Sequence, residues 1–205
     1  MPRSRALTFL FAFLLLATLS SGAAPNPTPI NLDFESGAPG EVPWPDLVGD
    51  AMDTEVHNLA LEGATSDHVV REQLPRALRL RPDLVSVVCG ANDVLLDVRP
   101  DLDAFAGNIE RLLRALSDVD RVVCATYPEA GRFLDLRPRT RRRVTRGLER
   151  VNVLIRATAE RHGALCLEWE GRDREADRTH YADDGLHPSP RGHRRAADDF
   201  TRTLE

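Results

Sequence analysis

Short apolar runs separated by segments of helical periodicity constrain this chain more than any other feature of its sequence. Leu84–Cys89 and Arg121–Ala125 are largely apolar, and Ala164–Trp169 is a third such run. Apolar runs of this length are typical of strands that are buried on both faces of a parallel sheet. Their alternation with helical segments predicts an α/β domain in which helices cover a parallel sheet.

The helices are marked by apolar stripes and by residues that begin or end helices. Asp101 is placed to cap a helix whose apolar stripe ends at Leu116, and Gly163 is placed to end a long helix. Pro75 is expected to interrupt a helix that begins at Ser66. The helices are expected at residues 45–52, 66–80, 101–116, 140–162 and 190–205, with further strands at 56–59 and, weakly, 30–34.

The first 23 residues differ from the rest of the chain. Arg3 and Arg5 precede an uncharged run from residue 6 to residue 19, and small residues follow as far as Ala23. This order is typical of a secretory signal peptide cleaved after Ala23, and the run is short for a membrane span of about 20 residues. We therefore expect residues 1–23 to be a signal peptide, 24–40 an irregular lead-in with a weak first strand, and 41–205 the folded domain of a secreted protein. The alternatives are an uncleaved anchor or a wrongly assigned gene start, and without a signal peptide the protein is expected in the cytoplasm.

Length, charge and cysteine content narrow the possible functions. A chain of 205 residues suits one domain, and its net charge of −5 does not suggest a nucleic-acid partner. Three cysteines exclude a disulfide scaffold. Cys89, Cys124 and Cys166 each lie in an apolar strand, so we expect them to be small buried hydrophobes. The sequence leaves the oligomeric state open.

Polar residues follow three of the predicted strands. Gly63 comes after the strand at 56–59, Asn92 and Asp93 follow the run that begins at Leu84, and Asp184 and His187 come after the last strand. Open parallel sheets form their binding and catalytic sites at the carboxyl ends of their strands. We therefore expect these segments to build the functional site.

At these segments the sequence resembles the SGNH or GDSL hydrolase family. Gly90-Ala91-Asn92-Asp93 matches the third block of that family, Gly-x-Asn-Asp, and Asp184-x-x-His187 followed by Pro matches its fifth block. Gly63 matches the second block. The resemblance covers roughly Trp44 to Phe200. It implies a three-layer α/β/α sandwich with a flavodoxin-like sheet, and a serine-type esterase that cleaves a small-molecule ester without a cofactor or a metal.

The resemblance implies a role for each matched residue, and the chemistry of the side chains fits those roles. Histidine side chains titrate near neutral pH, so His187 is suited to move a proton, and Asp184 is placed to orient its ring. The Asn92 side-chain amide and the Gly63 backbone N–H are suited to hold a developing oxyanion. Asp93 is expected to order its loop rather than to react.

The nucleophile is the missing part, because the sequence contains no Gly-Asp-Ser, the first block of the family. Phe34-Glu35-Ser36 is the best substitute and makes Ser36 the predicted nucleophile, although Phe fits poorly where a tight turn favours Gly. In a second alignment Thr28-Pro29-Ile30 takes that place and no nucleophile is present. In a third, the apolar run is itself the first strand, and Ser20 or Ser21 is the nucleophile.

The missing block also keeps a second function open. A member of the family without a nucleophile would be catalytically inactive and would bind an acylated or carbohydrate ligand. A change of reading frame upstream of about Glu41 would explain the poor match at the N-terminus in a different way, because it would replace the true first strand and its serine.

Three other features are given structural interpretations. His193 is not expected to join Asp184 and His187 in a metal site, since no second cluster of ligands accompanies them. Arg137–Arg150 is expected on a solvated helix face, with a phosphate group or an anionic surface as the alternative partner. Three aromatic residues are expected in the core rather than in a pocket, namely Trp44, Tyr127 and Trp169.

Overall fold

The computed structural model describes residues 6–13, 42–129, 133–169 and 178–205. Its centre is a parallel sheet with the strand order β2-β1-β4-β5-β6. These strands are β1 (Ala6–Phe13), β2 (Glu55–Asn58), β4 (Leu84–Val88), β5 (Arg121–Ala125) and β6 (Leu165–Leu167), and the short β3 (Leu61–Glu62) pairs with the end of β1. This is the flavodoxin-like order with β3 set aside, as expected.

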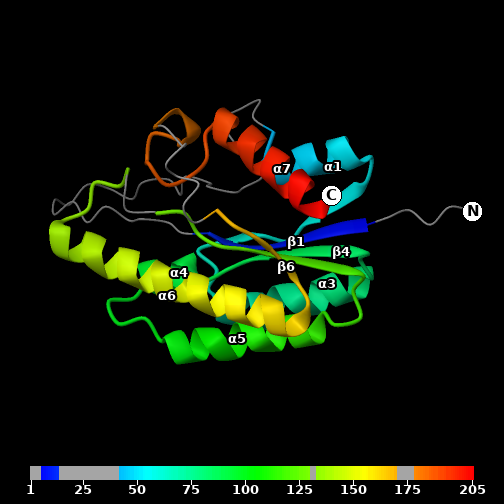
Figure 1. Cartoon of the computed structure of the whole chain (residues 1–205), viewed down its shortest axis with the longest axis horizontal. Coiled ribbons are helices and arrows are strands. Elements are labelled where there is room, and N and C mark those ends of the chain that lie inside the picture. The colour runs from blue at the N-terminus through cyan, green and yellow to red at the C-terminus, as the bar shows by residue number, and fades with distance from the viewer. Residues whose placement is uncertain (1–5, 14–41, 130–132, 170–177) are drawn as a thin grey trace, which may run out of the picture.

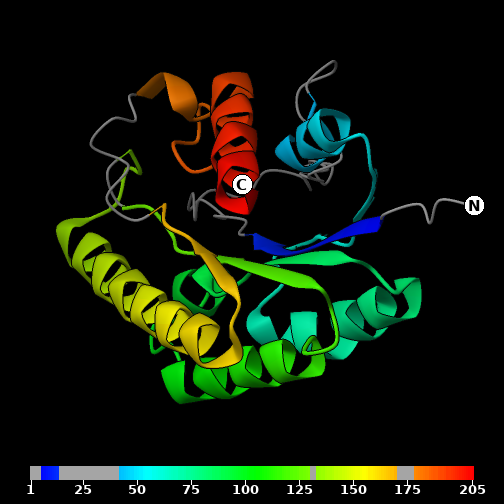
Figure 2. The same ribbon diagram turned by 45° about the vertical axis from the view of Figure 1, so that its right-hand side comes forward.

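Helices cover both faces of the sheet and complete a three-layer α/β/α sandwich (Figures 1 and 2). On one face lie α1 (Trp44–Met52) and α7 (Pro190–Leu204). On the other lie α3 (Leu74–Leu80), α4 (Ala91–Leu95), α5 (Leu102–Ala115) and α6 (Pro138–His162). Two short segments precede α3, namely α2 (Ser66–His68) and the π-helix Val69–Gln73, and the 3₁₀ helix Arg178–His180 precedes α7. Within the described residues, no helix is long and apolar enough to cross a membrane.

The core lies between the sheet and these helix layers. All five residues of β4 are buried, as the apolar run predicted. On the helix side, α5 buries an apolar stripe that includes Phe105, Ile109 and Leu112. At roughly 25 cal/mol per Å² of apolar surface, burial of such a stripe stabilises the helix far more than its intrinsic propensity does.

The first strand differs from the expectation. β1 lies at residues 6–13, inside the predicted signal peptide, and its backbone pairs with β2 on one side and β4 on the other. The weak strand expected at residues 30–34 lies outside the described residues. Cleavage after Ala23 stays a prediction, but it is incompatible with this sheet, because it would remove the strand that joins β2 to β4.

Helix ends follow the sequence signals closely. Asp101 caps α5 by accepting a hydrogen bond from the backbone N–H of Ala104, at 2.9 Å, and α6 ends at Gly163, whose φ is 67°. The expected break at Pro75 does not occur. The chain changes from π-helical to α-helical geometry just before Pro75, so this residue lies in the first turn of α3, where its missing N–H costs little.

Candidate active site

The strand order itself indicates where a site belongs. In a flavodoxin-like sheet, ligands bind at the carboxyl ends of the strands, where the strand order reverses. Here that position lies between β1 and β4, which pair in parallel from Leu7 opposite Leu84 to Phe11 opposite Val88. The Gly90-Ala91-Asn92-Asp93 segment follows β4 directly and therefore begins at this position.

Gly90 lets this segment turn close to two helices. Its φ is +124°, and a Cβ atom at this position would lie 2.7 Å from the ring of Phe105 in α5 and 2.8 Å from Val151 in α6. An L-residue would meet both a strained backbone and a filled core. The glycine therefore allows the chain to pass from β4 into α4 with Asn92 in the first turn.

Asn92 joins this turn to the loop that follows β3. Its side chain is fully buried, and Nδ2 donates a 2.7 Å hydrogen bond to the backbone carbonyl of Ala64. The side-chain amide carries two N–H groups, so one donor orients the residue against the loop. The neighbouring Gly63 has a φ of +68°, and a Cβ atom there would meet nothing within 4 Å. Gly63 and Asn92, expected together as oxyanion donors, thus belong to two loops in direct contact.

Asp93 fastens the same two loops a second time. Its carboxylate accepts hydrogen bonds from the backbone N–H of Ser66 at 2.9 Å and from the Ser66 hydroxyl at 2.5 Å. Asn108 of α5 donates to the Ser66 hydroxyl at 3.0 Å. A carboxylate on the first N–H groups of a helix is a favourable arrangement. These contacts fit the expected ordering role of Asp93. Nothing in the sequence indicated that Ser66 and Asn108 would take part in them.

Asp184 and His187 form a tight local pair. Oδ1 of Asp184 accepts hydrogen bonds from the backbone N–H groups of Leu186, at 2.9 Å, and His187, at 3.0 Å. Oδ2 of Asp184 is in short hydrogen-bond contact with Nδ1 of His187. The expected aspartate–histidine pair is therefore brought together, with the carboxylate fixed at one oxygen and facing the imidazole with the other.

The electrostatics of the pair follow from these contacts. Partial burial favours the neutral carboxyl group, but it is outweighed by the hydrogen bonds from the His187 side chain and from the two backbone N–H groups. Together these hold the pKa of Asp184 well below its usual range. Asp184 is therefore ionised at neutral pH and accepts a hydrogen bond from the N–H at Nδ1 of the ring. This hydrogen bond leaves Nε2 as the basic nitrogen of neutral His187.

The turn that holds the pair lies at the end of the molecule to which the parallel strands point (Figure 1). At its base an isolated antiparallel bridge joins Tyr181 and Pro188. Gly185, with a φ of +71°, lies so close to Phe133 that a Cβ atom would collide with the Phe133 carbonyl oxygen. Because Phe133 belongs to the connection between β5 and α6, the turn rests against a loop at the carboxyl edge of the sheet.

His193 and the aromatic residues Trp44, Tyr127 and Trp169 pack in or against the interior of the protein. Nδ1 of the buried His193 accepts a hydrogen bond from the backbone N–H of Trp44 at 3.2 Å, which ties α7 to the start of α1. Trp44 and Tyr127 are buried, and Trp169 packs edge to face on Trp44 with 6.0 Å between ring centroids. No group of His, Cys, Asp and Glu side chains that would hold a metal ion occurs within the described residues.

The cysteines are free and have no feature of a catalytic thiol. Cys89 and Cys124 are buried, and burial raises the pKa of Cys89 well above its usual value and that of Cys124 to about 12. Cys166 is half-buried, and burial together with the nearby Glu168 carboxylate raises its pKa to about 12. Thiols with raised pKa values carry little reactive thiolate at neutral pH.

The arginine-rich segment is only partly the solvated face that we expected. Arg139, Arg142 and Arg146 are exposed. Arg143, in contrast, donates to the backbone carbonyl of Val94 at 2.8 Å and is also in short hydrogen-bond contact with the carbonyl of residue 97. Arginine is suited to this task because its planar group carries several donors, and here it anchors the loop that follows α4.

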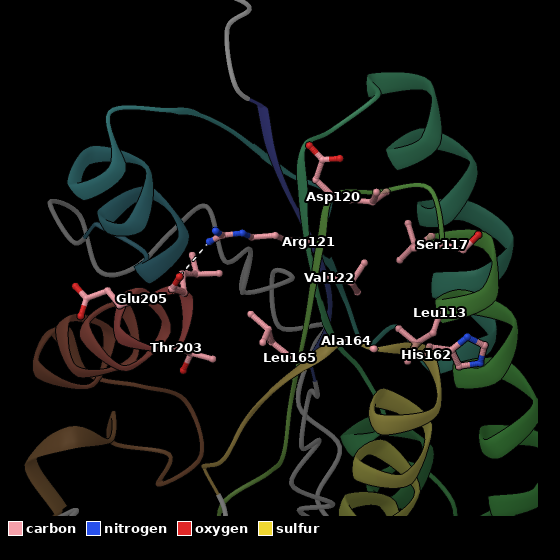
Figure 3. Close-up of a pocket in the computed structure, with 14 residues that line it drawn as sticks. Leu113, Ser117, Asp120, Arg121, Val122, His162, Ala164, Leu165, Thr203 and Glu205 are labelled. Carbon is pink, nitrogen blue, oxygen red and sulfur yellow. Dashed lines mark hydrogen bonds between the residues drawn. The ribbon is translucent and has the colours of Figure 1, made fainter.

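A hollow of about 410 Å³ lies away from these residues, at the opposite edge of the sheet (Figure 3). Arg121 and Leu165, which begin β5 and β6, lie on its wall, and the ends of α5, α6 and α7 complete it. Neither Asn92 nor the Asp184–His187 pair lines this hollow. We therefore do not assign the catalytic site to it.

The predicted nucleophile cannot be added to this geometry. Ser36 lies outside the described residues, and so do Ser20 and Ser21 of the alternative alignment. The support for Ser36 came from a strand expected at residues 30–34, whereas the first strand of the structure is the apolar run at residues 6–13. That position of β1 agrees with the third alignment, in which Ser20 or Ser21 follows the first strand.

The fold has counterparts among known proteins. A model of the GDSL-like lipase/acylhydrolase family matches residues 21–195. No match is found among curated proteins. A lipase/acylhydrolase from Enterococcus faecalis is 19% identical with a TM-score of 0.69, and the alignment covers 98% of this chain and 95% of that chain.

Two further solved structures are similar. A catalytic mutant of an acetylxylan esterase from Geobacillus stearothermophilus is 19% identical with a TM-score of 0.71, and the alignment covers 98% of this chain and 94% of that chain. An α/β hydrolase from the metagenome of Lake Arreo, Spain, is 19% identical with a TM-score of 0.69, over 97% of this chain and 94% of that chain. At these identities the likeness establishes the shared fold.

Proposed function

The chain belongs to the GDSL-like lipase/acylhydrolase family, and on that premise we propose that it hydrolyses small-molecule carboxylic esters through an acyl-enzyme. His187 transfers the proton, Asp184 orients His187, and Gly63 and Asn92 bind the oxyanion. A serine supplies the nucleophile. No step of this mechanism requires a cofactor, a metal or a nucleic acid.

The observation that carries the proposal is the contact between Nδ1 of His187 and Oδ2 of Asp184. An ionised carboxylate at Nδ1 selects the tautomer with its proton on that nitrogen, and it stabilises the imidazolium that forms when Nε2 takes a second proton. Two backbone N–H groups fix the other carboxylate oxygen. The pair is therefore suited to act as a base and then as an acid without rearranging.

The reaction then follows in two steps. The serine hydroxyl attacks the ester carbonyl and gives its proton to Nε2 of His187, and the tetrahedral intermediate expels the alcohol, which takes the proton from His187. In the second step water attacks the acyl-enzyme with the same help from His187, and the acid product leaves. Each step passes through an oxyanion.

The buried Asn92 amide and the Gly63 backbone are proposed to hold that oxyanion. The hydrogen bond from Asn92 to Ala64 fixes the plane of the amide, so its second N–H has a defined direction. A donor that is already oriented loses little entropy when charge develops, and one such donor is worth roughly 3 to 4 kcal/mol of transition-state stabilisation. The contact between the two loops supports a joint role for these residues.

The candidates for the nucleophile are Ser20, Ser21 and Ser36. A nucleophile in this fold class follows a strand directly, at the point where the strand order reverses. β1 ends at Phe13, so Ser20 and Ser21 are nearer to the end of the strand along the chain than Ser36 is.

Labelling with a serine-reactive fluorophosphonate, followed by peptide mapping, tests the proposal. We expect a single labelled serine, and we expect the label to be lost in His187→Ala, because the hydroxyl then has no base. His57→Ala, which removes a histidine from β2, is the matched control and should label like the wild type. A folded protein that takes no label would favour the inactive, ligand-binding function, and the DNA that encodes the N-terminal 40 residues should then be resequenced.

Export is a separate proposal that depends on Arg3, Arg5 and the apolar run up to Ala23. Its test is the intact mass of the protein after expression in a host that processes signal peptides. A mature chain that begins at Ala24 would establish export and would exclude β1 at residues 6–13 from the mature fold. A full-length folded chain in the cytoplasm would exclude the signal peptide.

A further inference from the structure

One arginine outside all the matched motifs holds the turn that carries Asp184. The Arg178 guanidinium donates three hydrogen bonds to three consecutive backbone carbonyls. Nη1 donates to Tyr181 at 2.9 Å and to Ala182 at 2.5 Å, and Nη2 donates to Asp183 at 2.9 Å. Among the described residues Arg178 has no carboxylate partner, so the charge of its guanidinium serves the backbone alone.

Backbone hydrogen bonds also support the turn, and one of them runs from the Gly185 N–H to the Ala182 carbonyl at 3.0 Å. The backbone N–H of Ala182 donates to the His187 carbonyl at 2.8 Å, and that of Ser189 donates to the His180 carbonyl at 2.9 Å. Within the described part of the chain, no strand ladder beyond this short bridge fixes the direction of the peptide planes. Three carbonyl dipoles that converge on one point repel one another unless a cation compensates them, and a planar guanidinium does so with several donors at once.

The last of the three carbonyls that Arg178 binds belongs to Asp183, the residue directly before Asp184. The peptide plane between Asp183 and Asp184 sets where the Asp184 carboxylate points, and this carboxylate is 46% exposed, so water competes for its oxygens. On its other side the turn lies against the Phe133 carbonyl at Gly185. Arg178 and Phe133 thus support the turn from two directions, Arg178 by hydrogen bonds to its carbonyls and Phe133 by close contact with Gly185.

We propose that Arg178 is a positioning residue, which holds the carbonyls of Tyr181, Ala182 and Asp183 so that the Asp184 carboxylate faces Nδ1 of His187. The inference rests on the proposed function, because it assigns Arg178 to the orientation of that acid–base pair. Arg178 does not touch the substrate in this role. It acts only through the geometry of the Asp184–His187 contact.

The test compares Arg178→Gln, Arg178→Lys and the control Arg194→Gln, which alters an exposed arginine of α7. Esterase activity is measured on p-nitrophenyl acetate across pH. For Arg178→Gln we expect kcat to fall about 10- to 100-fold, because the base is misplaced, with little change in KM. The acid limb of the kcat/KM profile should move to lower pH, because a misdirected Asp184 stabilises the imidazolium of His187 less.

Arg178→Lys should recover part of the loss, because one ammonium group reaches fewer carbonyls than a guanidinium does. It also protects the test against misfolding of the Gln variant. A purely structural Arg178 would lower the unfolding free energy without moving the acid limb, and that outcome in either variant would overturn the proposal. Arg194→Gln should match the wild type throughout.

A second readout separates this proposal from the proposed function. The Nδ1 proton of His187 gives a downfield proton NMR signal while it is hydrogen-bonded to Asp184, whether or not the protein turns over an ester. We expect this signal in the wild type and in Arg194→Gln, and its loss or broadening in Arg178→Gln. An unchanged signal in a folded Arg178→Gln variant would overturn the positioning role even if the wild type has no esterase activity.

Discussion

The two halves of the candidate site are built in opposite ways. The oxyanion half, formed by the Gly63–Ser66 loop and the Asn92–Asp93 turn, is held by hydrogen bonds between residues 27 and 28 positions apart. Asn92 is fully buried. In the acid–base half, the partners of Asp184 among the described residues are Leu186 and His187, and the Asp184 side chain is 46% exposed.

This difference predicts that activity and stability are coupled in the oxyanion half and separate in the acid–base half. A change in the oxyanion half leaves buried polar groups without a hydrogen-bond partner, so it should lower both stability and activity. A change in the acid–base half leaves the core intact, so it should cost activity with little change in stability. Four variants would sharpen or break this contrast.

The largest effect is expected from His187→Ala. Without the base, kcat for ester hydrolysis should fall by at least about 10³-fold, and by up to about 10⁶-fold if the serine and histidine act as one unit. The unfolding free energy in urea should change by less than about 1 kcal/mol, because the residue lies in a local turn. Unchanged hydrolysis would exclude His187 from the mechanism, whereas a large loss of stability would contradict the contrast.

Asn92→Ala should affect both quantities. We expect kcat to fall about 10²- to 10³-fold through loss of an oxyanion donor. The unfolding free energy should fall by about 1 to 3 kcal/mol, because the Ala64 carbonyl loses its buried donor. Kinetics and urea unfolding of the same preparation would check this. A variant that is inactive yet as stable as the wild type would show that the oxyanion half is not built into the core.

Asp93→Ala should affect mainly stability. Loss of its two hydrogen bonds to Ser66 should lower the unfolding free energy by about 2 kcal/mol, with a smaller loss of kcat than in Asn92→Ala. A double-mutant cycle with Ser66→Ala isolates the contact. The exposed Asp135→Ala is the control, and a similar loss there would mean that the effect is not specific to the loop.

The smallest effect is expected from Asp184→Asn on acid stability. The pKa of Asp184 is lower in the folded protein than in the unfolded chain, so its contribution to stability is present above the unfolded pKa of about 3.9 and is lost as pH falls below it. The wild type should therefore lose more unfolding free energy than the variant between pH 6 and pH 3. Parallel pH profiles would mean that the carboxylate is not stabilised by its hydrogen bonds.

Local signals predicted much of the fold. Some features depend on residues within a few positions of one another, so they can be predicted directly from the sequence. These are the strands β4 and β5, the Asp101 cap of α5 and the end of α6 at Gly163. β6 is shorter than its apolar run, since the strand ends at Leu167. Its end is set by pairing with β5 rather than by hydrophobicity.

The first strand shows where local reasoning fails. Two arginines followed by a long apolar run satisfy the pattern of a signal peptide as well as that of a buried strand, because both require uncharged apolar residues. Only pairing with β2 and β4 distinguishes the two interpretations. The same holds for Pro75, whose effect depends on a change of helix geometry that its neighbours do not announce.

The sequence by itself determined the class of fold and the residue types of the site, because hydrophobic periodicity and short motifs such as Gly90–Asp93 are properties of neighbouring residues. Tertiary structure alone decided how these pieces are held. Three sets of hydrogen bonds depend on where groups lie in space. They join Asn92 to Ala64, Asp93 to Ser66, and Arg178 to the turn that carries Asp184. A backbone carbonyl or N–H is the same group in every residue, so its partner cannot be read from the chain before the chain has folded.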